Sequence, residues 1–411
     1  MRVKQFSWLF TFMMLSVIIT SCEKEIGPSE SNQTFYFKKY GGLTADYNFF
    51  TIPSSDGGII VIGGSSGDTK HMRLDKMDGH GTELSTQLNG TLKDFFARKL
   101  TLPNGDHLIT SWVGGDVFRI SPNGKNLGHF EYVESYQPVY VFSDPILGND
   151  DSIYVGFGSG YGAGSSSNYL AVWGKDADTL GNLYNVPNSG LGFKALSFYP
   201  YRVELDADGE YTYWITGTCY PKSNWSWSDP IKVFFAKIGP DAEYSFKVLD
   251  PSSVEDRFVL SQTLNSDRTL TCVLSPGFFF FQGGENRNDL MEVINTDENN
   301  NVVWRTPIRF EQALNVNPTY IESTSDGGTV VCGYCTPLSS SYFQSFIMKL
   351  SATGTVQWRR IYDFGGSGLM YHVRETPEGY MATGSVAGFG KGKENDDHFI
   401  LMTDRNGNYR D

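Results

Sequence analysis

Residues 324–334 read TSDGGTVVCGY, a polar turn followed by a strand, and similar phrases recur along the chain. Gly beside Asp provides the backbone freedom of a tight turn, and alternation of apolar with small or polar residues indicates a half-buried strand. Seven copies align on the polar residue of the turn, at intervals of 46 to 59 residues. These marker residues are Asp56, Asn104, Asp150, Asp208, Asp267, Asp326 and Glu378.

A second phrase follows each copy, as in FIMKLSATGTVQW at 346–358, and predicts a further hairpin. Each repeat therefore reads as four strands, A to D, which is one propeller blade. The last repeat ends at Asp411 before a fourth strand can form, but TFYFKKYGG at 34–42 matches the fourth strand VQWRRIYDFGG at 356–366. We therefore expect an all-β, seven-bladed β-propeller over residues 34–411, with its last blade closed by the N-terminal strand.

Composition agrees with an all-β fold and restricts the partners. The chain has 45 Gly, 15% aromatic and only 19% charged residues, and its net charge is −13. No long window shows the 3.6-residue period of an amphipathic helix. Nucleic acid is excluded as a partner because phosphate binding depends on clustered Lys and Arg.

The N-terminus predicts export. Arg2 and Lys4 precede an apolar stretch of residues 8–19 that is too short to span a bilayer, so residues 1–21 are expected to be a signal peptide. Residues 19–22, ITSC, resemble a bacterial lipobox, which implies lipidation of Cys22 and attachment to the outer membrane, on its periplasmic side or at the cell surface. An ordinary secretory signal with a chance cysteine is the alternative. Residues 22–33 are polar and acidic and predict a disordered tether.

The phrase pair FIMKLSATGTVQW and TSDGGTVVCGY resembles the repeats of bacterial β-propeller lipoproteins in the quinoprotein-like (PQQ-like) group. The resemblance covers residues 34–411. It implies a scaffold or binding platform, and we expect no cofactor. The sialidase box is absent because SSDGGIIVI at 54–62 lacks its Trp.

The loops between strands B and C are irregular and aromatic in five neighbouring repeats, whereas the A–B and C–D turns are short. Loops on a rigid scaffold commonly carry function, and aromatic rings can stack on sugars or anchor a protein partner. The expected ligand-binding residues are Trp225, Trp227, Tyr161, Phe279, Phe280, Tyr342 and Phe343. The alternative is that these rings cover the underside of their own loops.

Catalytic and metal signals are weak. The six histidines, His71, His80, His107, His129, His372 and His398, lack metal-ligand spacing, and Asp206–Glu210 reads as a turn in preference to a calcium loop. Cys332 and Cys335 should point to opposite faces of a strand. With Cys219 and Cys272 they are expected to be small core residues. A disulfide is the alternative, because exported proteins can form one.

Three functions remain. The first is a monomeric, membrane-anchored binding module for a glycan or another extracellular ligand. The second is a scaffold lipoprotein of an outer-membrane complex, and the third is a polysaccharide lyase or glycosidase. No catalytic residue and no metal ligand is assigned from the sequence.

Overall fold

The computed structural model describes residues 37–40, 45–66, 70–78, 82–91, 97–111, 116–131, 139–141, 145–159, 167–173, 180–186, 194–220, 232–239, 244–249, 258–275, 289–339, 342–387 and 397–409. The chain divides into two units, Met1–Gln33 and Thr34–Asp411. Within the described ranges every regular element is a β-strand, and none is a helix able to cross a membrane. The predicted all-β class is therefore confirmed.

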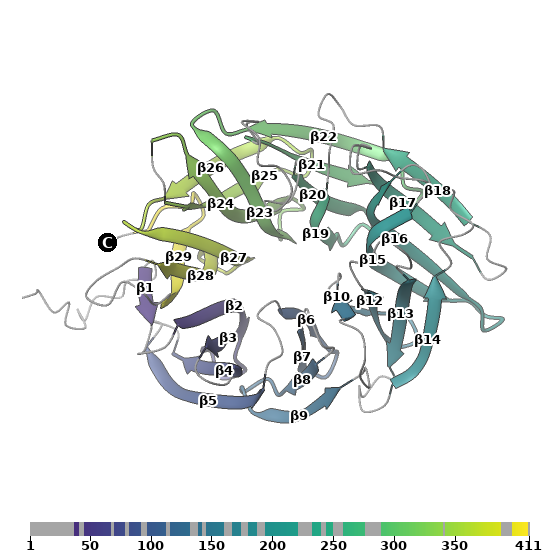
Figure 1. Cartoon of the computed structure of the whole chain (residues 1–411), viewed down its shortest axis with the longest axis horizontal. Helices are drawn as coiled ribbons and strands as arrows, with labels where there is room; N and C mark the ends of the chain where they lie inside the picture. The colour runs from purple at the N-terminus through teal and green to yellow at the C-terminus, as the bar shows by residue number, and fades with distance from the viewer. Residues whose placement is uncertain are drawn as a thin grey trace, which may run out of the picture. The chain divides into compact units, whose positions relative to one another are not determined.

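The described strands form small antiparallel sheets in a propeller arrangement, which Figure 1 shows. We number the sheets 1 to 7 in chain order. Sheet 1 contains β2 (Ala45–Pro53), β3 (Ile59–Ser66), β4 (Lys70–Met77) and β5 (Glu83–Thr91), and sheet 2 contains β6 (Ala97–Thr101), β7 (His107–Ser111), β8 (Asp116–Ile120) and β9 (Asn126–Glu131). Sheet 3 contains β10 (Val139–Val141), β11 (Ile146–Leu147), β12 (Ile153–Ser159), β13 (Ser167–Trp173) and β14 (Leu180–Val186).

The remaining sheets repeat the same order. Sheet 4 contains β15 (Lys194–Leu205), β16 (Tyr211–Tyr220), β17 (Lys232–Ile238) and β18 (Tyr244–Leu249), and sheet 5 contains β19 (Phe258–Leu264), β20 (Leu270–Ser275), β21 (Leu290–Thr296) and β22 (Val302–Arg309). Sheet 6 contains β23 (Ala313–Ser323), β24 (Thr329–Pro337), β25 (Gln344–Leu350) and β26 (Val356–Tyr362). Sheet 7 contains β27 (Ser367–Glu375), β28 (Gly379–Ala387), β29 (Asp397–Asp404) and β1 (Phe37–Tyr40).

Sheet 7 joins the two ends of the propeller unit. Its strand order is β1-β29-β28-β27, and β1 pairs antiparallel with β29, with Phe37 opposite Leu401 and Tyr40 opposite His398. The ring of Phe37 stacks on Phe364 with centroids 4.4 Å apart. The N-terminal strand is thus the outermost strand of the last sheet, as the sequence predicted.

The prediction of a seven-bladed propeller with four strands in each blade is not met at sheet 3. Six sheets have the predicted four strands, whereas sheet 3 has five because both β10 and β11 pair with β12. Residues 142–144, between β10 and β11, lie outside the described residues. The described structure therefore has six regular four-stranded sheets and one irregular sheet.

The core lies between neighbouring sheets. Side chains of consecutive residues on a strand point to opposite faces, so each third strand contributes to two interfaces. Phe346 on β25 packs with Val293 of sheet 5, whereas Ile347 packs with Phe399 of sheet 7. Ile400, next to Phe399, packs with Val61 of sheet 1. This double burial explains why these strands read as continuous apolar runs.

The cysteines follow the same rule. Cys332 and Cys335 are both on β24, but Cys332 lies in the core between sheets 6 and 7 and Cys335 in the core between sheets 5 and 6. Cys219 and Cys272 are buried in two further interfaces, and all four thiols are free. Burial raises the pKa of the Cys335 thiol to about 11. The predicted role as small core residues is confirmed.

The A–B turns carry a recurrent polar pattern. In sheet 6, Gly327 adopts φ +79°, which favours glycine, and a Cβ on Gly328 would lie 2.3 Å from the Leu350 carbonyl oxygen, so Gly328 has no room for a side chain. The Asp326 carboxylate accepts hydrogen bonds from Thr324 Oγ1 (2.6 Å) and Gly328 N (3.0 Å). Burial alone would raise the pKa of Asp326, but these bonds and Lys349 lower it to about 2.

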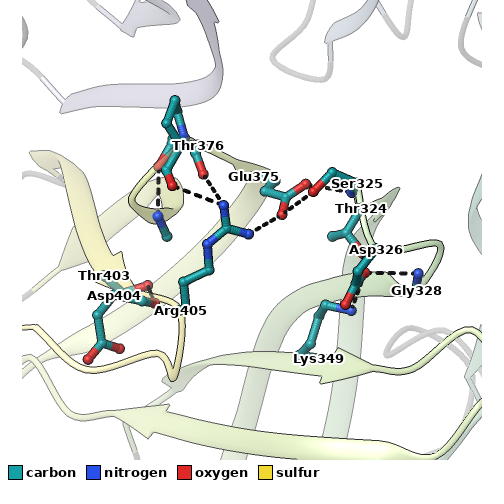
Figure 2. A network of polar contacts seen from close by, with 12 residues as sticks. Thr324, Ser325, Asp326, Gly328, Lys349, Glu375, Thr376, Thr403, Asp404 and Arg405 are labelled. Carbon is teal, nitrogen blue, oxygen red and sulfur yellow. Dashed lines mark hydrogen bonds and ion pairs between the residues drawn. The ribbon is translucent and has the colours of Figure 1, made fainter.

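Glu375, the last residue of β27, connects sheets 6 and 7 through these turns (Figure 2). Its carboxylate accepts hydrogen bonds from the backbone N (2.6 Å) and Oγ (2.9 Å) of Ser325 and pairs with the guanidinium of Arg405. Arg405 also donates to the Pro377 carbonyl at 2.9 Å. Burial raises the pKa of Glu375, but the bonds from Ser325 and Arg405 outweigh it and the net shift is downward.

We predict that Glu375→Ala lowers the free energy of unfolding by roughly 1–3 kcal/mol, because charge-assisted hydrogen bonds between two sheets are lost. Urea denaturation at pH 7 measures the effect. A carboxyl with a lowered folded-state pKa stabilises above its ordinary value of 4.5, so the gap between wild type and variant should narrow as the pH falls below that value. Exposed Glu378 in the same sheet provides the matched Glu378→Ala control. Equal destabilisation by the two variants would contradict the prediction.

Candidate functional site

The predicted loop residues are only partly within the described structure. Trp225, Trp227, Tyr161, Phe279 and Phe280 lie outside the described residues, as does Cys22. Tyr342 and Phe343, which precede β25 in the B–C loop of sheet 6, are described. Their surroundings decide between the two alternatives from the sequence, which are a ring exposed to a ligand and a ring that covers the underside of its own loop.

Tyr342 is exposed, whereas Phe343 packs against its own sheet. The Tyr342 side chain is 55% exposed. Phe343 is half-buried, and its ring meets Tyr334 of β24 edge to face, with centroids 5.3 Å apart. The Phe343 carbonyl also accepts a hydrogen bond from Gly368 N of sheet 7 at 2.8 Å. The Phe343 ring thus packs on its own sheet, whereas the Tyr342 side chain is more than half exposed.

Residues in and next to the A–B and C–D turns make hydrogen bonds between neighbouring sheets. Ser55 N donates to the Pro122 carbonyl of sheet 2 at 2.9 Å, and Trp304 Nε1 of sheet 5 donates to the Ala352 carbonyl of sheet 6 at 3.0 Å. Leu205 N of sheet 4 donates to Asn149 Oδ1 of sheet 3 at 2.7 Å. These turns therefore serve the stability of the fold.

A second candidate site lies on the first strands of three sheets. We call it the inner-strand cluster: Lys99 on β6, Tyr320 and Glu322 on β23, and His372 and Arg374 on β27. Figure 1 shows these three strands toward the middle of the propeller. Residues two apart on a strand share a face, so β23 and β27 each contribute a ring followed by a charged group.

His372 is at the centre of this cluster and is fully buried. Lys99 Nζ lies 2.7 Å from His372 Nε2, although the two residues are 273 positions apart in the sequence. The His372 ring packs against Tyr320 at 4.5 Å and edge-on against Phe50 of sheet 1 at 5.8 Å between centroids. Four sheets therefore meet around one imidazole.

The charges around His372 fix its protonation state. Burial is the main reason that the pKa of His372 falls well below its ordinary value, and the cations Lys99 and Arg374 lower it further. The imidazole is therefore neutral at pH 7. An ammonium can only donate, so Lys99 donates to Nε2 and the proton of the neutral ring resides on Nδ1. Nδ1 has no hydrogen-bond partner in the structure.

Glu322 and Arg374 complete the cluster. Burial raises the pKa of the Glu322 carboxyl, against the opposing effect of Lys99 and Arg374. Burial lowers the pKa of Arg374, with Glu322 acting in the opposite direction. Arg374 Nε is also buried without a hydrogen-bond partner. The cluster thus combines mixed charge with two buried donors that have no hydrogen-bond partner.

The other described histidines have structural surroundings. His398 Nε2 lies 3.5 Å from Asp75 Oδ2, while Arg73 Nε binds the same carboxylate at 2.8 Å. Burial and Arg73 lower the pKa of His398 to about 3, so that ring is neutral. His107 on β7 lies 3.0 Å from Thr101 Oγ1. Among the described residues, no group of three or more His, Cys, Asp and Glu side chains could hold a metal ion.

No protein-family model matches the chain, and no curated protein matches it. The similar solved structures include a virginiamycin B lyase from Staphylococcus aureus with quinupristin, at 11% identity and a TM-score of 0.48, covering 90% of this chain and 100% of that one. A protein of unknown function from Dyadobacter fermentans has 9% identity, a TM-score of 0.47 and coverages of 89% and 99%. A polysaccharide lyase has 9% identity, a TM-score of 0.48 and coverages of 92% and 94%. At such values no functional residue is carried over to this chain.

We predict that His372→Gln reduces the acid sensitivity of folding. Below about pH 6.5 the unfolded chain binds a proton at His372 that the folded state does not, so stability falls as the pH falls, by up to about 1.4 kcal/mol per pH unit. Glutamine keeps an acceptor for Lys99 but does not titrate. Urea denaturation should show that the free energy of unfolding falls less between pH 8 and pH 5 in the variant than in wild type. The difference in the free energy of unfolding between the two proteins at pH 8 reports the change in packing alone. Identical pH slopes would contradict the assignment.

Proposed function

We propose that this protein is a lipid-anchored, extracytoplasmic binding module that holds a glycan or another extracellular ligand on the B–C loops of a β-propeller. The observation that carries the proposal is the 55% exposed ring of Tyr342, next to Phe343, which is fixed to the scaffold through Tyr334. An exposed aromatic ring can stack on the C–H face of a sugar.

The contrast between the A–B and C–D turns and the B–C loops supports ligand binding at the B–C loops. The A–B and C–D turns make hydrogen bonds between sheets, as at Ser55, Asn149 and Ser325. The B–C loops vary in length and are rich in aromatic residues in the sequence, so their composition serves a purpose other than closing a hairpin. Loops with such freedom on a rigid scaffold are the usual place for ligand binding.

We further propose that the irregular sheet 3 is the seventh blade of a closed ring. The pairing of β1 with β29 supports closure at the chain ends, and Asn149 with Leu205 supports a contact between sheets 3 and 4. A closed ring leaves no open sheet at its ends and holds the B–C loops on a common rim.

The cellular location is also a proposal that rests on the sequence. The ITSC motif at 19–22 supports lipidation of Cys22, and the acidic residues that follow resemble export signals of surface-displayed lipoproteins in some Gram-negative bacteria. Several acyl chains on one cysteine would provide stable membrane attachment.

A scaffold role in an outer-membrane complex is the second candidate. Exposed apolar side chains on the outermost strands favour it, because such residues can be covered by a protein partner. They include Leu84 on β5, Leu127 on β9, Phe246 on β18, Val303 on β22 and Ile361 on β26.

We predict that Tyr342→Ala, combined with Trp225→Ala and Trp227→Ala, abolishes retention of the protein on a carbohydrate array, with little change in melting temperature. Each lost ring removes stacking worth about 1 kcal/mol or more, and three together weaken binding by roughly a hundredfold.

Leu84→Ala is the matched control, since Leu84 is similarly exposed but lies on an outer strand. Retention of wild type and control, with loss in the triple variant, supports the proposal. Equal retention of all three proteins contradicts it. No retention of wild type, together with co-purification of an outer-membrane protein that Phe246→Asp abolishes, favours the scaffold role.

We predict that expression in a Gram-negative host yields a chain cleaved before Cys22 and acylated on it. Metabolic labelling with an alkyne fatty acid and mass spectrometry of the N-terminal peptide measure both events. Cys22→Ser should lose the label and move to the soluble fraction. An unlabelled wild-type chain with residues 1–21 removed would support the ordinary secretory signal instead.

A further inference from the structure

Three exposed apolar side chains lie at the B–C edge of sheet 6. Leu314 is 42% exposed, Leu338 52% and Tyr342 55%. Leu314 is the second residue of β23, Leu338 follows β24 directly, and Tyr342 precedes β25 by two residues. In an antiparallel sheet the start of the first strand, the end of the second and the start of the third share one edge. We call these three residues the sheet 6 platform.

Backbone contacts bring the members of the sheet 6 platform to the same place. Leu338 N donates a hydrogen bond to the Gln312 carbonyl at 2.8 Å, which places Leu338 beside the start of β23 and Leu314. The antiparallel pairing of β24 with β25 returns the chain to this edge at Tyr342, four residues after Leu338. Exposed apolar residues are ordinary when they are scattered singly, but a group of them indicates a binding surface.

An aromatic ring with two leucines at the same edge fits a sugar that carries a methyl group. The Tyr342 ring can stack on the C–H face of a pyranose. The methyl of an N-acetylhexosamine or of a 6-deoxyhexose gains from contact with Leu314 and Leu338, whereas the hydroxyl groups of a plain hexose gain nothing from aliphatic side chains. Gln312, which is also exposed, has an amide that can donate to and accept from sugar hydroxyls.

The charged groups at this edge disfavour an acidic sugar. Glu311 precedes β23 by two residues and Asp363 follows β26 directly, and both side chains are exposed. The cation at the end of β22, Arg309, is bound to the Asp289 carboxylate at 3.1 Å, and Arg359 of β26 donates to the Arg309 carbonyl at 2.9 Å. A uronate or a sulfated sugar at the sheet 6 platform would therefore be repelled by exposed carboxylates.

We propose that the sheet 6 platform selects a neutral glycan whose sugars carry a methyl group. The inference rests on the proposed binding of a glycan by the B–C loops and specifies the class of that glycan. Aliphatic contact favours the methyl-bearing sugar, and the exposed carboxylates disfavour an anionic one, so the same edge selects in both directions. N-acetylhexosamines and 6-deoxyhexoses share this chemistry, and the test distinguishes them.

The test compares oligosaccharides that differ in their substituents. Binding to the full chain, purified in detergent at pH 7, is measured by calorimetric titration with chitotetraose, cellotetraose, tetragalacturonate and a rhamnose tetrasaccharide. Chitotetraose and cellotetraose share their linkage and differ only in the N-acetyl group. We expect chitotetraose or the rhamnose tetrasaccharide to bind about fourfold tighter than cellotetraose or better, because a methyl group is buried, and tetragalacturonate to bind most weakly.

The outcomes separate this inference from the proposed function. Equal binding of cellotetraose, or tighter binding of tetragalacturonate, overturns the inference. If that binding is lost in Tyr342→Ala, glycan binding by the B–C loops still stands. Absence of binding to all four tetrasaccharides also overturns the inference, and retention on the carbohydrate array then decides separately whether the protein binds any glycan.

Variants locate the methyl contact. Leu314→Ala and Leu338→Ala should each lower the ratio of the affinities for the preferred methyl-bearing tetrasaccharide and cellotetraose by about twofold, because each removes aliphatic surface, while the affinity for cellotetraose stays nearly unchanged. Leu84→Ala is the matched control, since Leu84 is 59% exposed on the outer strand β5, and it should leave the ratio unchanged. An unchanged ratio in both platform variants, or an equal change in the control, overturns the location.

A gain of binding tests the role of the carboxylates. Glu311→Gln combined with Asp363→Asn should strengthen the binding of tetragalacturonate by about twofold to fivefold at low salt, and the gain should disappear at high salt. Glu378→Gln, which removes an exposed carboxylate from the A–B turn of sheet 7, is the control and should give no gain. No gain in the double variant, or an equal gain in the control, overturns the electrostatic part of the inference.

Discussion

The pairing of β1 with β29 is the constraint on which the rest of the structure depends. Without it, β29 would be an edge strand with unpaired backbone groups, and the core between sheets 6 and 7 would lose Phe37. Phe37 lies 4.4 Å from Phe364 and 5.6 Å from Phe399 between ring centroids, so the backbone pairing and the packing of rings reinforce each other. Joining the ends of the chain costs loop-closure entropy, which these contacts offset.

The inner-strand cluster is a consequence of that arrangement. Lys99 and His372 come from sheets 2 and 7, and only sheets brought around a common centre can place them in contact. A comparison with Asp75 shows what is unusual. There the buried carboxylate has Arg73 at 2.8 Å and a hydrogen bond from Thr86, so its charge is compensated. At the inner-strand cluster, by contrast, His372 Nδ1 and Arg374 Nε are buried without a hydrogen-bond partner.

The fold could be predicted from the sequence because its determinants are local and repeated. The turn around Asp326 contains its own hydrogen-bond acceptor and its own glycines, and the copy of a fourth strand at 34–42 identified the closing strand. Sheet 3 was predicted less well, because both β10 and β11 pair with β12 where the repeat pattern predicts one strand. The inner-strand cluster was missed, since its residues belong to three distant repeats. The available signal was that Lys99, Glu322 and Arg374 stand four or five residues before their turn markers, where a charged side chain on an inner strand has few apolar neighbours.

Tyr342 and Phe343 illustrate why composition alone could not assign the loop residues. Neighbouring residues of an extended segment point to opposite sides, so one aromatic of an adjacent pair anchors the loop and the other is exposed. Phe343 contacts Tyr334 edge to face, whereas the Tyr342 side chain is 55% exposed. Trp225 and Trp227 are spaced by two, and in an extended segment both rings would take the same side.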